Sequence, residues 1–534
     1  MKNWIWIALA ILTTSCSSPS TPHAKKEPLF ASTQVMRLNL SVEPFTLDPR
    51  RARDAMAVNL CEFLYEGLMR NGPDGKLLLA AAEKMSLSSD MKVYTFTLRD
   101  SKWSNGLTVT AYDFEKTWKT SLSPSFPSDN AYLLFAIKNA KEAKTGKIDV
   151  DAIGVKALDE KTLQIELNNP TPYFTQLLTH PITFALPRTS SAWEVVDSDI
   201  IVNGPFKVNK WQHNQELTLA KNQSYWDADQ VKLERVDCLM IKNSSTELHL
   251  FQDNQLDWVG SPLGSFSEEA IDSWKQRKQL QSQAMAGTYW LRVNVNKAPF
   301  DNGNLRRALA LAINRKELID NVLKGNQIPA LGIVPPSMWA DGQRICYFRD
   351  GDFSTAKRLM RDGLLELGLS AEQLPPMTLL INNNEKNRRF AQALQQQWKN
   401  VLGVDVNIQV NDYGVYLQNV KEKNFQICMG NWLADFNDAT NFLEVFKYNF
   451  ATTNNTNWEN KDYTTLLDEA DRTSNTEHRQ ILMQKAEKLL IEEMPVIPLY
   501  HCTFNYAQKD NLKGVVLSPL GFMDIKWAYI EEQK

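Results

Sequence analysis

The sequence predicts an α/β protein with two or three domains. Its 534 residues exceed what one hydrophobic core usually organises. Segments with the period-two alternation of strands are mixed along the chain with amphipathic segments of helical length, which is typical of α/β architecture and not of a helical bundle or a sandwich. The apolar content of 43% and the charged content of 23% are those of a soluble globular protein.

A strand, a tight turn and a helix are predicted in succession within residues 93–118. Apolar and polar side chains alternate over residues 93–98, as in a strand with one buried face. The Asn-Gly pair at 105–106 supplies the positive-φ residues of the turn. Thr110 and Asp113 have the spacing of a capping box, so we expect a helix to begin directly after Thr110.

Further segments have the periodicity of helices. They cover residues 61–68, 300–315, 390–401 and 462–493. Near the carboxyl end, Pro495 and Pro498 bracket a short strand that is expected to end at Tyr500.

The amino terminus has the pattern of a bacterial lipoprotein signal. Lys2 precedes an apolar run over residues 4–12, which is too short to span a bilayer, and small residues lead into Cys16. Such a signal, residues 1–15, is cleaved before the cysteine, whose sulfur then carries a lipid. Thr13 departs from the pattern, since Leu is preferred there, and the alternative is a cleaved signal with Cys16 incidental. Residues 16–29 read as a flexible tether, and no later segment has the roughly 18 unbroken apolar residues of a span.

The cysteines indicate neither a metal site nor a disulfide framework. There are six, at positions 16, 61, 238, 346, 428 and 502. Without Cys16 the number is odd, and the scattered spacing fits no zinc motif and no small disulfide scaffold. We expect mostly buried apolar positions and allow for one disulfide, whose partners the spacing does not identify.

Composition and motifs argue against nucleic-acid binding and against catalysis. The net charge is −3 and the basic residues are evenly mixed with acidic ones, so no electrostatic footprint for nucleic acid exists. The six histidines lie far apart, and there is no G-x-S-x-G and no G-x-x-x-x-G-K sequence. We therefore expect no enzyme, no cofactor and no metal; a secreted hydrolase stays open as an alternative.

The order of motifs is more specific than any one of them. Residues 99–118 read R-D-x-x-W-S-N-G-x-x-V-T-A-x-D-F-x-x-T-W, and LDP, YEGL, NGPF and P-V-I-P-L-Y occur before and after. From about Leu38 to the carboxyl end, this order resembles the oligopeptide-permease binding proteins, the extracytoplasmic peptide-binding lipoproteins of ABC importers (extracellular solute-binding protein family 5).

The resemblance implies a two-lobed, periplasmic-binding-protein-like (type II) fold with an additional domain inserted in the first lobe. The first lobe would comprise residues 30–65, 190–286 and 503–534. The inserted domain would be residues 66–189 and the second lobe residues 287–502.

The resemblance also implies ligand contacts. Family members have a Trp-x-Ala-Asp-Tyr-Asn-like run, matched here by Trp432, Asp435 and Asn437, whose Asp accepts the peptide's α-ammonium. Trp432 and the nearby backbone would pair with the extended peptide. Tyr413 matches an aromatic residue that stacks on ligand side chains. The alternatives are that Asp435 caps a helix beginning near Asn437 and that Tyr413 belongs to the core.

Departures from the family concern the peptide's carboxyl end. The positions that supply cations there carry uncharged residues, namely Leu323, Asn387, Val420 and Met429. Amidation of a ligand's carboxyl end should therefore change affinity little unless another arginine has taken over. The candidates are Arg53 (which replaces an acidic pocket residue), Arg292, Arg388 and Arg389, each with the alternative of a solvated surface charge. A family disulfide pair is replaced by Gly287 and Leu433.

Together these features predict a monomeric, extracytoplasmic lipoprotein, anchored on the periplasmic side of the cell membrane. It would capture a short peptide, or a peptide-containing cell-wall fragment, and deliver it to the permease subunits of an ABC importer. A nickel- or haem-type binding protein of the same fold is the alternative.

Overall fold

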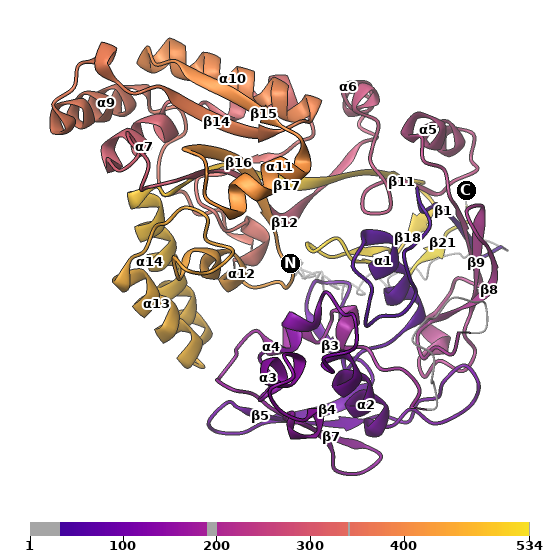
Figure 1. Cartoon of the computed structure of the whole chain (residues 1–534). Helices are drawn as coiled ribbons and strands as arrows, with labels where there is room; N and C mark the ends of the chain where they lie inside the picture. The colour runs from indigo at the N-terminus through magenta and orange to yellow at the C-terminus, as the bar shows by residue number, and fades with distance from the viewer. Residues whose placement is uncertain (1–32, 189–199, 340–341, 533–534) are drawn as a thin grey trace, which may run out of the picture.

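The computed structural model describes residues 33–188, 200–339 and 342–532. Two bodies of mixed helix and sheet lie on either side of a pair of long strands, β12 (Gln281–Val293) and β17 (Val496–Gln508) (Figure 1). The predicted signal, Cys16 and the tether lie outside the described residues.

Buried apolar side chains form three large clusters, and each cluster comes from one or a few continuous stretches of the sequence. One runs from Trp290 to Tyr500 and a second from Leu68 to Ala185. The third combines Met36–Tyr65, Phe184–Leu263 and Leu512–Ile530. We propose the predicted limits as domain boundaries, and within the described residues we call 33–65, 200–286 and 503–532 the first lobe, 66–188 the inserted domain and 287–502 the second lobe.

The first lobe is built on a four-stranded sheet of order β1-β10-β9-β8, in which β1 is parallel to β10 and the other pairs are antiparallel. Short carboxyl-terminal strands return to this lobe. Its elements are β1 (Val35–Asn39), α1 (Ala55–Leu64), β8 (Phe206–Gln212), β9 (Glu216–Lys221), β10 (Arg235–Leu239), α5 (Ser244–Gln252), β11 (Trp258–Gly260), α6 (Ile271–Gln276), β18 (Leu512–Lys513), β19 (Val516–Leu517), β20 (Met523–Asp524) and β21 (Tyr529–Ile530).

The inserted domain is an antiparallel sheet of order β4-β5-β7-β6 with a separate β2-β3 hairpin. Its elements are β2 (Met69–Asn71), β3 (Leu77–Leu79), β4 (Ala82–Leu87), β5 (Val93–Leu98), α2 (Ala111–Ser121), α3 (Ala140–Lys144), β6 (Val155–Ala157), β7 (Thr162–Glu166) and α4 (Phe174–Leu177).

The strand, turn and helix predicted within residues 93–118 are present as β5 and α2. The Asp113 carboxylate accepts the Thr110 backbone N–H at 2.8 Å, so the first turn of α2 is bonded as the spacing predicts. Of the two turn residues only Gly106 has positive φ, because the turn closes through a hydrogen bond from the Gly106 N–H to the Trp103 carbonyl and needs one left-handed residue. The expectation for Asn105 was wrong.

The second lobe is built on a sheet of order β17-β12-β16-β14-β15, in which β14 is parallel to β15 and β16, and β11 of the first lobe extends this sheet by pairing with β17. Its remaining elements are α7 (Gly303–Leu311), α8 (Arg315–Leu318), β13 (Ile328–Pro329), α9 (Phe353–Leu367), β14 (Met377–Asn382), α10 (Glu385–Leu402), β15 (Val406–Asn411), α11 (Tyr413–Lys421), β16 (Ile427–Leu433), α12 (Thr440–Leu443), α13 (Lys461–Arg472) and α14 (Thr476–Glu493).

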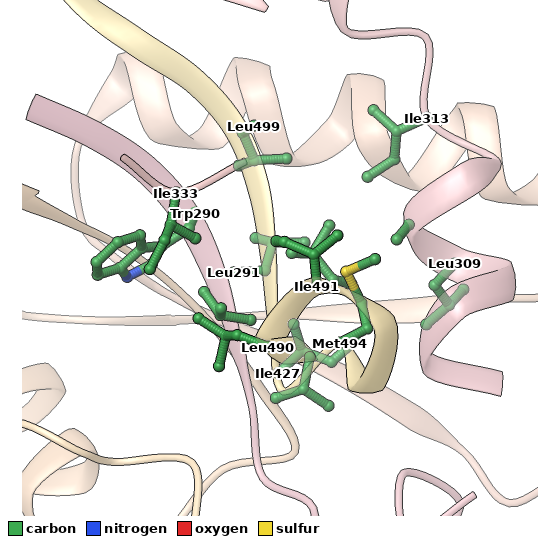
Figure 2. Packing of buried hydrophobic residues seen from close by; sticks show 14 of the residues in the cluster. Trp290, Leu291, Leu309, Ile313, Ile333, Ile427, Leu490, Ile491, Met494 and Leu499 are labelled. Carbon is green, nitrogen blue, oxygen red and sulfur yellow. The ribbon is translucent and has the colours of Figure 1, made fainter. Parts of the chain in front are cut away.

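The core of this lobe lies between the sheet and helices α7 and α14. Figure 2 shows Leu291 of β12 beside Leu490 and Ile491 of α14, with Leu309 of α7 across from them, while Trp290 of β12 lies beside Ile333. These side chains are at most 3% exposed. Burial on this scale fixes β12, and with it β16, in the lobe.

Strands β12 and β17 connect the two lobes. They pair with each other in antiparallel register from Gln281↔Tyr506 to Arg292↔Val496, with irregularities between Ala284 and Thr288 and between Tyr289 and Trp290. The predicted short strand ending at Tyr500 was wrong in length: β17 continues to Gln508 because β12 supplies hydrogen-bonding partners beyond Tyr500.

Three predicted helices have other limits, and in each case an N-cap is the reason. Asn314 caps α8, so the segment 300–315 is divided into α7 and α8. Asn475 caps α14 by accepting the His478 N–H, which divides 462–493 into α13 and α14. Asp54 caps α1, which therefore begins at Ala55; the helix ends at Leu64 because Tyr65, the first residue of YEGL, is extended. The helix predicted at 390–401 is confirmed as part of α10.

None of the helices in the three described ranges has the length and apolar character that a membrane span requires. The five described cysteines form no disulfide, so the bridge that the sequence allowed for is absent among them. Cys61, Cys238 and Cys428 are buried as expected, whereas Cys346 is exposed.

Candidate ligand-binding site

Strand β16 presents an open edge on one side. It pairs over its full length with Gly287–Val293 of β12. On its other side β14 pairs only with Ile427 and Cys428. From Met429 to Leu433 this edge has no strand partner among the described residues, which is the arrangement that lets an extended peptide add as a further strand.

Asp435 lies two residues beyond the end of β16, half-buried. Burial raises the pKa of its carboxyl above the usual range, while hydrogen bonds from Tyr132 and Asn441 act against that rise. Asn441 in turn accepts the indole N–H of Trp432 at 2.7 Å. Asp435 and Trp432, which the motif predicted, therefore lie in one hydrogen-bonded group.

The alternative in which Asp435 caps a helix does not match the local hydrogen bonds. Helix α12 begins at Thr440, and the Thr440 N–H donates to Asp438 at 3.0 Å. Arg479 holds the same Asp438 carboxylate through two hydrogen bonds of 2.7 and 2.8 Å. The side-chain oxygen of Asn437 is buried without a hydrogen-bond partner. The carboxylate at the start of α12 is therefore Asp438, and Asp435 does not cap this helix.

The inserted domain contacts the segment around Asp435 across the interlobe gap. Phe436, next to Asp435, stacks on Tyr173 with ring centroids 4.5 Å apart and planes 6° apart. Beside this stack a cavity of about 750 Å³ lies between the inserted domain and the second lobe. Tyr132, Tyr173 and Phe436 line it together with Glu444 and Lys447. Charged side chains line it beside these aromatic rings, namely Lys92, Glu444, Lys447, Asp468, Asp471 and Arg472, so it suits a polar organic ligand of peptide size.

Tyr413 is the first residue of α11 and is 63% exposed. The alternative that placed it in the core is therefore wrong. Its ring stacks on Tyr416 with centroids 6.3 Å apart. Exposure leaves Tyr413 accessible to a ligand, although no contact with the Asp435 group is present.

Three of the four candidate arginines lie on the surface with partners of their own. Arg53 pairs with Asp129 at 2.6 Å, and its guanidinium lies 4.7 Å from the centroid of the Phe45 ring. Arg389 pairs with Glu268 at 3.3 Å, and Arg388 donates to the Asn383 side chain at 2.8 Å. Arg292 differs, since it is only 9% exposed.

The positions that correspond to the family's disulfide lie directly opposite each other. Gly287 of β12 pairs with Leu433 of β16, and a Cβ atom on Gly287 would lie 2.6 Å from the Leu433 side chain. Leu433 occupies the space next to Gly287, so the pair is replaced by packing.

Tyr132, Tyr173 and Asn441 belong to the site geometry and were not predicted. Tyr132 lies in a 3-10 helix, Ala131–Leu134, of the inserted domain, about 300 residues before Asp435 in the chain. No local motif links these positions, so only the packing of two domains could have identified them. Within the described ranges, no group of three His, Cys, Asp or Glu residues is placed to hold a metal ion.

Comparison with known proteins gives consistent matches over the whole chain. The sequence profile described as "Bacterial extracellular solute-binding proteins, family 5 Middle" matches residues 76–454. The oligopeptide-binding protein OppA of Bacillus subtilis is 39% identical, covering 99% of this chain and 100% of the relative. The dipeptide-binding protein DppE of the same organism is 34% identical, covering 93% of this chain and 92% of the relative.

Solved structures match the fold. The murein tripeptide binding protein MppA in its unliganded open form superposes with a TM-score of 0.85 at 26% identity, covering 95% of this chain and 99% of that one. Haemophilus influenzae OppA in complex with the peptide RPPGFSPFR superposes with a TM-score of 0.72 at 26% identity, covering 94% of this chain and 100% of that one. The predicted two-lobed type II fold with an additional domain is thereby confirmed, and the lobes here are arranged more as in the open form.

Proposed function

Because the chain belongs to the bacterial extracellular solute-binding proteins of family 5, we propose that it captures short peptides between its lobes and delivers them to an ABC importer. The observation that carries the proposal is the position of Asp435, a half-buried carboxylate at the end of a strand whose edge is open. Relatives named for oligopeptides, dipeptides and a murein tripeptide support it.

In this proposal the peptide's α-ammonium binds the Asp435 carboxylate. Every peptide with a free amino end carries this charge, so one carboxylate recognises the class without reading side chains. The peptide backbone then pairs with the open edge of β16, which provides affinity through main-chain hydrogen bonds. Trp432 and Asn437 would contact its first residues, Tyr413 would stack on a ligand side chain, and Arg53 would face the peptide from the first lobe.

The family and the relatives are binding proteins, and we propose that this chain likewise carries out no reaction on its ligand. Incubation with peptides followed by mass spectrometry tests this point. Intact peptides together with saturable binding are expected, and new peptide termini would contradict it.

We also propose that the protein is a monomer held outside the cytoplasm by a lipid on Cys16. The signal-like amino terminus supports the lipid anchor. Cys16→Ser should abolish labelling by a palmitate analogue in growing cells, and a labelled variant would contradict the anchor. Wild type carrying an unrelated Ser17→Ala change serves as the control.

The peptide proposal itself is tested by isothermal calorimetry with peptides of two to six residues and, in parallel, by native mass spectrometry of protein purified from its own cells. We expect saturable binding of peptides and a co-purified peptide. A co-purified nickel complex or haem, with no peptide binding, would favour the other ligand classes of this fold.

A further inference from the structure

Arg292 is a buried cation without a buried counter-charge. It is 9% exposed, and no carboxylate of the described residues lies within ion-pair distance of it. Its Nε has no hydrogen-bond partner, and one guanidinium nitrogen donates a long bond of 3.4 Å to the Asn431 carbonyl. The Trp290 ring, 5.9 Å away, and the Cys428 sulfur are its other polarisable neighbours. A desolvated charge without an opposite charge is costly, so the position suits an anion supplied from outside.

The guanidinium of Arg292 also crosses beneath a neighbouring strand. Arg292 belongs to β12, yet its Nη1 lies where a Cβ on Gly430 of β16 would be, at 1.9 Å. Only glycine at position 430 leaves this path free. The side chain thereby reaches the Asn431 carbonyl.

The Asn431 carbonyl lies on the open edge of β16. Carbonyls two residues apart in a strand point to the same edge. The Met429 carbonyl accepts the Tyr416 hydroxyl from α11, which packs on the side of β14 and not of β12. By alternation the Asn431 carbonyl faces this same open edge. The guanidinium is therefore at the edge where the proposed peptide strand would pair.

We propose that Arg292 binds the carboxylate at the peptide's carboxyl end. The inference rests on the proposed peptide function and adds the group that completes it. The other three candidate arginines are exposed and have partners, whereas a ligand carboxylate would give Arg292 the counter-charge it lacks. The peptide runs antiparallel to β16, with its amino end at Asp435.

The distance between Asp435 and Arg292 sets the length of the peptide that can bind both. Asp435 lies four residues beyond Asn431, which is about 13 Å at roughly 3.3 Å per residue of extended chain. An extended peptide of about four residues spans that distance between its end charges. Free peptides of three to five residues are therefore the substrate class that Asp435 and Arg292 select together.

The test is calorimetry of one tetrapeptide as its free acid and as its carboxyl-terminal amide, against wild type, Arg292→Gln and Gly430→Ala. For wild type we expect amidation to weaken binding at least about tenfold, as for a desolvated charge pair that loses one partner. In each of the two variants, the affinities for the free acid and for the amide should lie within about threefold of each other. In Gly430→Ala the arginine is retained, but the new Cβ takes the place of its Nη1.

Arg388→Gln, at an exposed arginine of α10, is the matched control and should keep the tenfold preference for the acid. If Arg292→Gln binds the amide with the same affinity as wild type, the variant is folded. If Arg292→Gln does not fold, the result for Gly430→Ala decides whether Arg292 binds the carboxylate. Equal binding of acid and amide by wild type, or a retained tenfold preference in the deciding variant, overturns the role of Arg292. Failure of every peptide to bind wild type overturns the peptide function itself, which is a different result.

Discussion

The chemistry of Asp435 depends on two opposing effects at a single side chain. Burial favours its protonated form, whereas the hydrogen bonds with Tyr132 and Asn441 favour the carboxylate. Since an ammonium ion binds the charged form, the hydroxyl of Tyr132 keeps the site ready for a ligand. The contact between Tyr132 and Asp435 joins the inserted domain to the second lobe, so it depends on how these two domains are arranged.

Replacing Tyr132 with Phe should therefore make peptide binding fail at a higher pH than in wild type. Loss of the hydrogen bond raises the pKa of Asp435 further, so the carboxylate is lost earlier as the pH falls. At neutral pH the carboxylate persists and affinity should change by less than about tenfold. Calorimetry of one tetrapeptide from pH 7 downward measures the profile.

Tyr112→Phe, at an exposed tyrosine of α2 in the same domain, should leave the profile unchanged. Superimposable profiles for wild type and Tyr132→Phe would mean that the hydroxyl has no influence on the Asp435 carboxylate.

At this scale the sequence named Asp435, Trp432 and Arg292 as candidate ligand contacts, which stay predictions, and it did not name Tyr132. The Trp-x-x-Asp spacing within 432–437 is local, so a motif could identify Asp435 and Trp432. Tyr132 reaches Asp435 from another domain, and Arg292, although a candidate from the sequence, passes beneath a neighbouring strand in a way that the sequence did not predict. Their roles follow from three-dimensional packing, which no spacing along the chain encodes.

Among the elements, helix α14 organises the second lobe through a buried glutamate. Glu487 is fully buried and accepts the backbone N–H groups of Ile333 and Val334 at 2.6 and 2.8 Å, and the Tyr347 hydroxyl at 2.9 Å. The loop that precedes α9 is thereby tied to the helix. Burial raises the pKa of Glu487 to about 7, above the ordinary value of 4.5.

This raised pKa predicts a pH-dependent stability. The protonated glutamic acid is the form that burial favours, so its contribution is complete below pH 4.5 and is lost as the pH rises through about 7. Over that window the free energy of unfolding of wild type should fall relative to Glu487→Gln by on the order of 3 kcal/mol. Denaturant unfolding of both proteins between pH 4.5 and 8 measures the difference.

Glu492→Gln, at an exposed position of the same helix, is the control and should differ from wild type by the same amount at every pH. A pH-independent difference for Glu487→Gln as well would show that Glu487 ionises as an ordinary surface carboxylate does.

The elements themselves were largely predictable where the signal is local. Alternation identified β5, and the periodicity of 390–401 identified α10. Helix divisions were missed because the apolar periodicity continues across Asn314 and Asn475, whose side chains start new helices. The length of β17 was missed because its second half depends on pairing with β12 and not on its own pattern.

For the whole molecule, the ion pairs that link the second lobe to the α6 region are weak enough to permit closure. Lys324 pairs with Asp272 at 2.6 Å and Arg389 with Glu268 at 3.3 Å, linking the second lobe to the α6 region. All four side chains are about half exposed, so such pairs contribute little and resist a rotation weakly. Closure would turn about β12 and β17, which are the two connecting strands.

Small-angle scattering should detect this closure. The higher TM-score with an unliganded open form than with a peptide complex indicates that the lobes here are apart. A saturating tetrapeptide should reduce the radius of gyration, because the lobes move together over it. The same peptide with an acetylated amino end, which lacks the ammonium group, serves as the control and should leave the radius near the ligand-free value. Equal radii with and without bound tetrapeptide would contradict closure.

The central claim is that a carboxylate at position 435 recognises the free amino end of a peptide. Calorimetry over four combinations tests it most directly, with wild type and Asp435→Asn each titrated with a tetrapeptide and with its N-acetylated form. We expect Asp435→Asn, which keeps the shape and removes the charge, to weaken the free peptide at least about tenfold, or about 1.4 kcal/mol. The acetylated peptide should bind wild type poorly and lose little more in the variant, so that the two changes are coupled. Equal affinity of wild type for the free and the acetylated peptide would contradict the claim.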